Sequence, residues 1–208
     1  GWIKENKIPI RYHYQENQGM HGAHNTAYRL ITTELNTCID SDDYMPDDAV
    51  EKIVTFWKKH GSNQVAGIIG LDADFQGNII GTTFSEKQTT LGKFYAQGGK
   101  GDKKMIYRTE IINQYPEYPL FKGEKYVSLG YKYELIDQDY SLLTLNEVLV
   151  KVEYRPDGSS MNMFRQYIKN PQGFAFIRKS SMQLAPTAKR RFMEAIHYVS
   201  SSLILKNK

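Results

Sequence analysis

The sequence predicts an α/β fold with a mostly parallel central sheet and a helical C-terminal part. Three observations lead to this fold class. A chain of 208 residues is long enough for one sizeable core. Short apolar or alternating runs that are typical of strands follow one another along the chain, separated by segments of helical periodicity. The last third is helical in pattern, so we expect one domain that spans residues 1–208.

The composition is that of an ordinary globular protein. Hydrophobic residues make up 40% and charged residues 24%, which excludes disordered and fibrous classes. A net charge of +4 favours phosphate-bearing ligands or an anionic membrane surface. The charge is too small to require nucleic acid, and we expect no nucleic-acid partner.

The cysteine content and the termini bear on location. Cys38 is the single cysteine, which excludes an internal disulfide framework, and we expect a cytoplasmic protein. No run of about 18 apolar residues predicts a membrane span. The start, Gly1-Trp2-Ile3-Lys4, resembles the middle of an element, so we expect a chain truncated at its N-terminus.

The first quarter of the chain predicts a strand followed by a helix. Residues Ile8 to Tyr14 alternate apolar and polar side chains, which is typical of a strand. A loop of residues 15–19 follows. From Ala23 to Leu30 the apolar residues recur on one helical face, formed by Ala23, Ala27, Leu30 and Ile31, and the helix is expected to end near Thr33.

A second strand and helix frame an acidic cluster. Residues Leu35 to Ile39 are short and apolar enough for a buried strand, and Asp40-Ser41-Asp42-Asp43 follows at its C-terminal end. Pro46 suits the first turn of a helix. The apolar residues that recur at helical spacing after it are Val50, Ile53, Val54 and Trp57.

The middle of the chain predicts further strands around a long loop. The expected elements are strands at Val65–Leu71 and Lys104–Arg108, mostly loop over 72–101, a helix at Glu124–Ile136, and a strand at Glu147–Tyr154 closed by the turn 155–158. Alternation of strands with helices is what favours a mostly parallel sheet.

The C-terminal residues 187–208 predict a basic amphipathic helix. Its apolar stripe comprises Phe192, Ala195, Ile196, Val199 and Leu203, and Lys189, Arg190 and Arg191 begin the helix. Two interpretations remain open. The stripe packs on the core, or it forms a surface that rests peripherally on anionic lipid or on a partner.

The acidic cluster suggests a cation site. Asp40 and Asp42 are separated by one residue, so a sharp turn after a strand lets both reach one divalent cation. Carboxylate oxygens suit Mg²⁺ or Mn²⁺. Such a cation holds a diphosphate and neutralises the charge that builds on it as it leaves. The alternative is that these acids only form a turn and cap a helix.

The surroundings of this cluster resemble glycosyltransferase family 2. In that family a loop rich in Asn and Gly, a helix that begins near an Asn, and a strand that ends in Asp-x-Asp-Asp occur in this order. The matching segments here are Gln15-Glu16-Asn17-Gln18-Gly19-Met20-His21-Gly22-Ala23-His24-Asn25-Thr26-Ala27 and Cys38-Ile39-Asp40-Ser41-Asp42-Asp43-Tyr44-Met45-Pro46-Asp47-Asp48-Ala49. Later segments at 105–110, 121–126 and 152–160 are also similar, so the resemblance covers most of residues 8–175.

The resemblance implies a GT-A fold and an inverting, metal-dependent glycosyltransferase of the hexosyltransferase class. It implies a nucleotide-diphosphate sugar as donor, usually a UDP-sugar, and a saccharide or lipid-linked acceptor in bacterial cell-envelope polysaccharide synthesis. Asp42 and Asp40 match the family's metal-and-diphosphate motif, with Asp42 as the more direct ligand of Mn²⁺ or Mg²⁺. His24 and Asn25 match the segment that lines the donor pocket.

The resemblance also implies a general base. The matching position is Glu124, which would accept the proton of the acceptor hydroxyl. Lys125 stands where many relatives carry an Asp, and the alternative is that Glu124 is a carboxylate at a helix N-terminus. His21 and His24 lie three apart on the predicted helix, so a shared metal is a further alternative for these two histidines.

Two family motifs are missing from the sequence. Members normally open with strands that end in Pro-x-Tyr-Asn and Asp-Asp-Gly-Ser, which seat the nucleobase and ribose. Neither occurs here, so we expect little or no transferase activity from this chain alone. A nucleotidyltransferase that makes a sugar nucleotide, and a non-catalytic fragment or scaffold, are the competing hypotheses.

Overall fold

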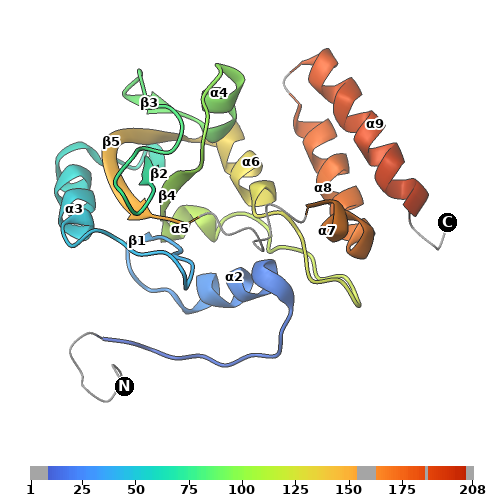
Figure 1. The fold of residues 1–208 in the computed structure, drawn as a ribbon, viewed down its shortest axis with the longest axis horizontal. Coiled ribbons are helices and arrows are strands. Elements are labelled where there is room, and N and C mark those ends of the chain that lie inside the picture. Colours follow the sequence, from blue (N-terminus) through green and yellow to red (C-terminus); the bar gives the residue numbers. More distant parts are fainter. Residues whose placement is uncertain (1–8, 154–162, 186, 205–208) are drawn as a thin grey trace.

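The fold is known from a computed structural model that describes residues 9–153, 163–185 and 187–204. It confirms the α/β class. Five strands in these residues form one sheet in the order β1-β4-β2-β5-β3, with helices on both faces (Figure 1). The elements are α2 (Gly19–Leu30), β1 (Leu35–Asn36), α3 (Ala49–His60), β2 (Val65–Ala73), β3 (Gln88–Thr89), α4 (Leu91–Ala96), β4 (Lys103–Arg108), α5 (Thr109–Ile112), α6 (Gly130–Asp139), β5 (Ser141–Lys151), α7 (Met163–Lys169), α8 (Pro171–Leu184) and α9 (Ala188–Ile204).

The sheet is mixed rather than mostly parallel, which corrects one part of the prediction. β2 and β5 are parallel, whereas β4 is antiparallel to both β1 and β2, and β3 is antiparallel to β5. The excursion over residues 74–102, which contains β3 and α4, turns the chain round before it enters β4. Alternation of strand and helix patterns in a sequence does not reveal such a reversal.

The central strand β2 is the best-predicted part of the sheet. All nine residues from Val65 to Ala73 are buried, because β4 and β5 flank the strand and helices cover both faces. An apolar run without alternation is what a strand buried on both faces requires. β4 is also confirmed. β5 begins at Ser141, before the predicted Glu147, while Tyr154 and the turn 155–158 lie outside the described residues.

Two hydrophobic clusters lie on opposite faces of the sheet. α3 covers one face with Ala49, Ile53 and Trp57, whereas Val50 and Val54, which were predicted to share its apolar face, are exposed. The indole Nε1 of Trp57 donates to Glu34 Oε1 at 2.7 Å, which ties α3 to the chain before β1. The other face is covered by α2, α4, α5 and α6. Its buried residues include Tyr28, Ile69, Phe94, Tyr107, Ile111, Tyr118 and Ile136.

α2 confirms the predicted first helix but buries a different face. The helix begins at Gly19, and its buried residues are His21, Gly22, His24, Asn25 and Tyr28. The expected apolar face is wrong, because Ala23, Ala27 and Leu30 are exposed. The buried polar side chains find hydrogen-bond partners inside the protein, as described below, which offsets the cost of removing them from water.

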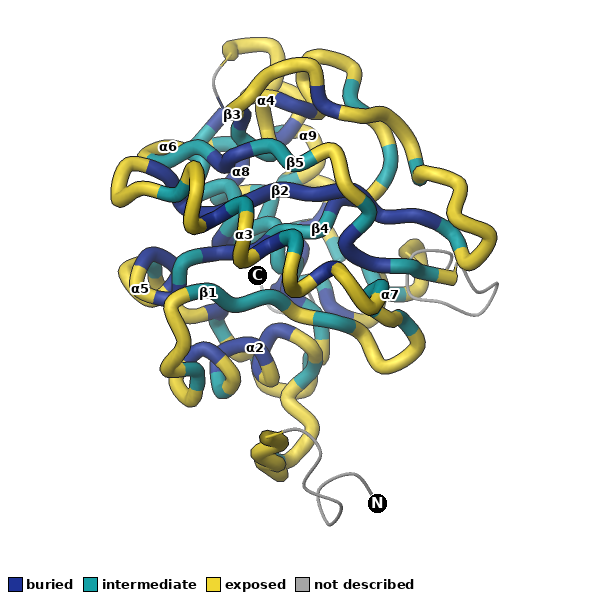
Figure 2. Tube along the Cα trace, turned by 90° about the vertical axis from the view of Figure 1, so that its left-hand side faces the viewer, coloured by how far each residue is buried: buried dark blue, intermediate teal, exposed yellow. Residues whose placement is uncertain are grey.

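The predicted strand at Ile8–Tyr14 is wrong for residues 9–14, and Ile8 lies outside the described residues. Residues 9–18 form no regular element and run along the outside of the molecule beneath α2 (Figure 1), where almost all are exposed (Figure 2). No strand pairs with them in the described part of the chain. Tyr12 and Tyr14 therefore stay exposed despite their alternating pattern.

The C-terminal third is helical, as predicted. α8 packs on the sheet domain through Phe176, which contacts Tyr131 at a ring-centroid distance of 4.8 Å, and α9 lies along the outer side of α8 (Figure 1). Of the two interpretations of the α9 stripe, packing on the core is wrong for Phe192, Ile196, Val199 and Leu203, which are exposed, while Ala195 is half-buried. No helix among the described residues is long and apolar enough to span a membrane.

Candidate functional site

The acidic turn, residues 40–43, lies where the chain leaves β1 and crosses the end of the sheet. The Asp43 amide donates to the Asp40 carbonyl at 3.1 Å and closes the turn. On one side Lys104 Nζ donates to the Cys38 carbonyl at 3.0 Å. On the other side Tyr44 and Lys151 exchange backbone hydrogen bonds of 3.1 and 2.8 Å. The turn is thus fixed to β4 and to the end of β5. Its acids follow a strand, but β1 covers only Leu35–Asn36 of the predicted buried strand Leu35–Ile39 and is half-buried.

The carboxylates of this turn differ in exposure. Asp40 and Asp42 are exposed, whereas Asp43 is half-buried. The pKa of Asp43 is raised, first by burial and then by the charges of Asp40 and Asp42. Three acids therefore share one small region, and the two exposed ones face solvent. Cys38, just before the turn, is exposed.

Asp72 is a buried acid near the end of β2 that was not predicted as a site residue. Asp72 is 4% exposed, and its Oδ1 has no hydrogen-bond partner among the described residues. Burial raises the pKa of Asp72 to about 6, and Lys104, Asp102 and Asp43 are close enough to act on it electrostatically. It therefore adjoins the acidic turn. An Asp directly after the apolar run of Val65–Leu71 was the available signal, but it was assigned to the start of a loop.

His24 lies on the inner face of α2, close enough to the acidic turn for Asp40 to act on it electrostatically. Burial lowers the pKa of His24, and the nearby Asp40 carboxylate opposes that shift. The ring Nδ1 is hydrogen-bonded to Tyr28 Oη at 3.0 Å. The structure thus brings two predicted site residues, His24 and Asp40, into one neighbourhood.

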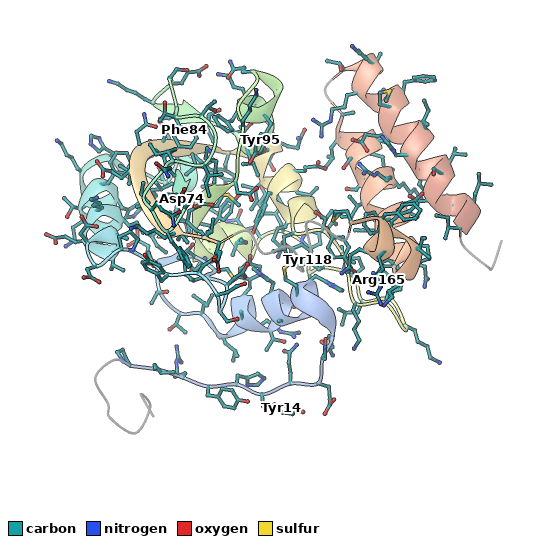
Figure 3. All side chains as sticks on the ribbon, in the orientation of Figure 1. Tyr14, Asp74, Phe84, Tyr95, Tyr118 and Arg165 are labelled. Carbon is teal, nitrogen blue, oxygen red and sulfur yellow. The ribbon has the colours of Figure 1, made fainter. Side chains whose placement is uncertain are left out.

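Asn25 joins α2 to the loop before α6. Its Nδ2 donates to the Tyr118 carbonyl at 2.8 Å, and its Oδ1 accepts from the Tyr118 amide at 2.9 Å. Tyr118 is buried between α2 and α6 (Figure 3). The amide of Asn25 is 4% exposed, so this side chain fixes α2 in place, and direct contact with a donor stays a prediction.

His21 supports the same junction. Its Nδ1 accepts a hydrogen bond from the Val127 amide at 3.2 Å, and burial lowers the pKa of His21. The alternative of a metal shared by His21 and His24 gains no support. Within the described ranges, no three His, Cys, Asp or Glu side chains cluster in a way that would hold a metal ion.

Glu124 does not begin a helix, since α6 starts at Gly130 and residues 124–128 form no regular element. Its carboxylate instead accepts from the backbone amides of Gln172 and Gly173 at 2.9 and 2.8 Å. These amides belong to the first turn of α8, whose N-terminal partial positive charge favours a carboxylate there. The geometry therefore favours the helix-terminus interpretation, with α8 as the helix concerned.

Two glycines permit the close approach of the segment that carries Glu124. A Cβ on Gly19 would lie 2.2 Å from the Lys125 carbonyl oxygen, and a Cβ on Gly173 would lie 2.1 Å from the Tyr126 carbonyl oxygen. Gly19 also has a positive φ of 81°. The segment is therefore held between the starts of α2 and α8, which explains why Glu124 reaches the α8 amides.

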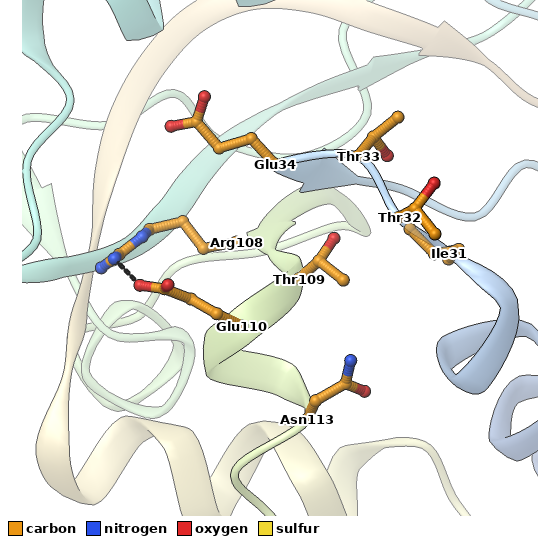
Figure 4. Close-up of a pocket in the computed structure, with 8 residues that line it drawn as sticks. All are labelled: Ile31, Thr32, Thr33, Glu34, Arg108, Thr109, Glu110 and Asn113. Carbon is orange, nitrogen blue, oxygen red and sulfur yellow. Dashed lines mark hydrogen bonds and ion pairs between the residues drawn. The ribbon is translucent and has the colours of Figure 1, made fainter.

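A cavity of about 540 Å³ lies at the opposite end of β1 from the acidic turn. Figure 4 shows its lining side chains, including the ion pair between Arg108 and Glu110. Its lining comprises Ile31, Thr32, Thr33, Glu34, Arg108, Thr109, Glu110 and Asn113. Glu34 and Arg108 are engaged by Trp57 and by the Asn63 and Val65 carbonyls. None of the predicted site residues lines this cavity.

The chain matches a known protein family in sequence and known structures in fold. The family model described as glycosyl transferase family 2 matches residues 2–115. No curated protein matches the chain. The structure is similar to S. aureus TarS 1-349 in complex with UDP-GlcNAc, with a TM-score of 0.60 and 14% identity over 97% of this chain and 58% of that one. TarS 1-349 in complex with UDP gives a TM-score of 0.57 and 13% identity over 99% and 57%. The chain thus spans less than two thirds of these structures, and the likeness concerns the fold.

Proposed function

From the premise that the chain belongs to glycosyl transferase family 2, we propose that the protein transfers a sugar from a nucleotide-diphosphate donor to a saccharide or lipid-linked acceptor. The observation that carries the proposal is the acidic turn, in which Asp40 and Asp42 are exposed at the end of the sheet. On open α/β sheets, ligands gather beyond the carboxyl ends of strands. We assign donor binding to this turn.

The exposed carboxylates of Asp40 and Asp42 are the ligand type that a hard divalent cation takes, although no three acids of the described residues cluster closely enough to hold a metal by themselves. Two carboxylates provide only part of a cation's coordination shell. Mg²⁺ in particular is held by one or two carboxylates together with substrate phosphates. Burial, and after it the charges of Asp40 and Asp42, raise the pKa of Asp43, so these three acids lie near one another. Asp42 and Asp40 would hold Mn²⁺ or Mg²⁺. When bound, the cation would neutralise the charge of the departing diphosphate.

The donor we propose is a UDP-sugar. TarS, which shares the fold, has been solved with UDP-GlcNAc and with UDP, and this supports a uridine nucleotide without naming the sugar. We place the reaction in the cytoplasm, in the assembly of a bacterial cell-envelope polysaccharide. The acceptor oxygen attacks the anomeric carbon as the bond to the diphosphate breaks, with inversion, and the acceptor proton passes to a base.

Glu124 has two candidate roles, general base and positioning residue. By resemblance to the family Glu124 is the base, but both of its oxygens accept amide hydrogens of α8. We assign Glu124 a positioning role, in which it fixes residues 124–127 against the start of α8. His21 of α2 contacts the same segment through Val127, and α2 also carries His24, which lies near Asp40.

Substitution of Asp42 tests the proposal. In a protein that also carries the strands that seat the nucleobase and ribose, we expect Asp42→Ala to lower Mn²⁺-dependent release of UDP from a UDP-sugar by about 10²-fold or more, because the cation that neutralises the leaving diphosphate is lost. Asp47→Ala is the matched control, since Asp47 is exposed just beyond the turn, and it should leave the rate unchanged. Normal turnover by Asp42→Ala would overturn the assignment of the turn.

A further inference from the structure

The outward face of α9 is an apolar stripe. Phe192, Ile196, Val199 and Leu203 are 66, 48, 56 and 66% exposed. Their spacing places all four on one side of the helix. α9 packs along α8 with its other side (Figure 1). Scattered apolar residues are normal on a surface, but a contiguous stripe over the length of a helix marks an interaction site.

The two buried residues of the same helix are both polar, and Ala195, Tyr198 and Ile204 are half-buried. Glu194 and Ser201 are its buried residues, and Glu194 Oε2 accepts from Arg178 Nη1 of α8 at 3.1 Å. A surface helix usually directs its apolar stripe towards the core, whereas the stripe of α9 points away from it. This orientation indicates that the apolar side of α9 has an apolar environment of its own outside the described fold.

The charge around the stripe favours anionic lipid as that environment. Residues 163–204 contain seven Lys and Arg residues and a single carboxylate, that of Glu194. Lys189 and Arg191 are exposed at the start of α9, and Lys189 lies on the same side of the helix as Phe192 and Ile196. A second copy of this face would bring like charges together, because a two-fold interface apposes identical patches.

α7 adds to the same end of the molecule. Tyr167 Oη donates to Ser200 Oγ of α9 at 2.9 Å, which places α7 beside α9. Phe164 and Ile168 of α7 are 76 and 51% exposed. Arg165 and Lys169 on this helix are exposed as well. Apolar and basic side chains thus occur together on both helices.

We propose that α9 is an interfacial helix that docks the protein on an anionic membrane. Phe192, Ile196, Val199 and Leu203 enter the boundary between headgroups and acyl chains, and Lys189 and Arg191 meet the headgroups. This combination of an apolar face with flanking cations is that of helices that lie in the membrane plane. The inference stands independently of the proposed transferase activity.

Vesicle flotation tests the proposal with matched variants. The purified protein should float with vesicles of phosphatidylcholine mixed with phosphatidylglycerol, and much less with phosphatidylcholine alone. Ile196→Glu with Val199→Glu should reduce flotation by about tenfold or more, because two charges enter the apolar stripe. The control is Val50→Glu with Val54→Glu, which places the same charges on exposed valines of α3 and should float normally.

Charge reversal tests the electrostatic part. Lys189→Glu with Arg191→Glu should weaken binding to the anionic vesicles by at least about fivefold for each residue. Added salt should weaken the binding of the wild-type protein to the same vesicles. Lys58→Glu with Lys59→Glu on the last turn of α3 is the matched control. Unchanged flotation of the stripe or charge variants, or flotation independent of the anionic lipid, would overturn the proposal.

A labelling measurement covers the case in which a charged variant fails to fold. An environment-sensitive fluorophore on Leu203→Cys, in a Cys38→Ser background, should shift to the blue when anionic vesicles are added. No shift would contradict docking. Light scattering tests whether a second copy of the chain covers the stripe instead. If the wild type is a dimer that does not bind vesicles, and the Ile196→Glu, Val199→Glu variant is a monomer, the stripe is a dimer interface and the proposal is overturned.

Discussion

The acidic turn and the Glu124 segment both place carboxylates that match family positions, yet the two differ in what those carboxylates do. Asp40 and Asp42 are exposed, and no hydrogen bond to their side chains occurs among the described residues. Glu124 accepts two amide hydrogens from α8. A carboxylate open to solvent is available for a cation or a substrate, whereas one that satisfies a helix N-terminus contributes mainly to the fold.

Asp72 stands between these cases. It is buried like a structural residue, yet one of its oxygens lacks a partner in the described part of the chain. A buried acid of this kind with a raised pKa is typical of functional sites. The acids of this protein thus differ in how many of their oxygens accept hydrogen bonds within the fold, and variants of each acid test what that difference means.

The largest effect on stability is expected at Glu124. Glu124→Ala removes two charge-assisted hydrogen bonds from the first turn of α8, and we expect unfolding free energy to fall by about 2–3 kcal/mol. Glu124→Gln keeps one acceptor and should cost about 1 kcal/mol. Urea denaturation measures both, with Gln172→Ala as the control, because that change keeps the backbone amide.

The same variants separate the positioning role from general base catalysis. Glu124→Gln should keep turnover within severalfold of the wild type once it is folded. A loss of about 10²-fold or more, with an unchanged unfolding free energy, would contradict the positioning role and identify Glu124 as the base.

A smaller effect, with a defined pH dependence, is expected at Asp72. Because burial raises its pKa to about 6 from 3.8, the folded state binds the proton more tightly than the unfolded state does. The protonated form thus stabilises the fold at low pH, and this contribution is lost as pH rises through about 6. Asp72→Asn should therefore stabilise the protein by about 1–2 kcal/mol at pH 8 and by little near pH 4.

Thermal melts over this pH range measure the Asp72 effect. Asp47→Asn, a change of an exposed acid, should stay within about 0.5 kcal/mol of the wild type throughout. Equal stability of Asp72→Asn and the wild type at pH 8 would mean that Asp72 is charged and paired. Its oxygens would then accept hydrogen bonds within the fold, as those of Glu124 do.

Much of the sheet could be predicted because its strongest signals are local. The run of Val65–Leu71 and the helix that buries Ile53 and Trp57 follow from hydrophobic periodicity alone. Strand direction could not be predicted, since it depends on the excursion over residues 74–102. The α9 stripe was predicted, but its outward orientation depends on Glu194 pairing with Arg178 of another helix.

The candidate site was predictable in part. The place of Asp40 and Asp42 after a strand follows from their position in sequence, and their proximity to His24 follows from resemblance rather than from pattern. The role of Glu124 depends on Gln172 and Gly173, which lie far along the chain. Contacts of that range leave no local trace in the sequence.

Calorimetric titration with UDP, with and without Mn²⁺, of the protein encoded by the complete open reading frame that contains this chain tests whether the acidic turn binds a cation and a diphosphate together. We predict binding that requires Mn²⁺ and weakens by about tenfold or more in Asp42→Asn, with Asp47→Asn unchanged. UDP binding of the same strength in Asp42→Asn, or no dependence on the cation in the wild type, would contradict this prediction.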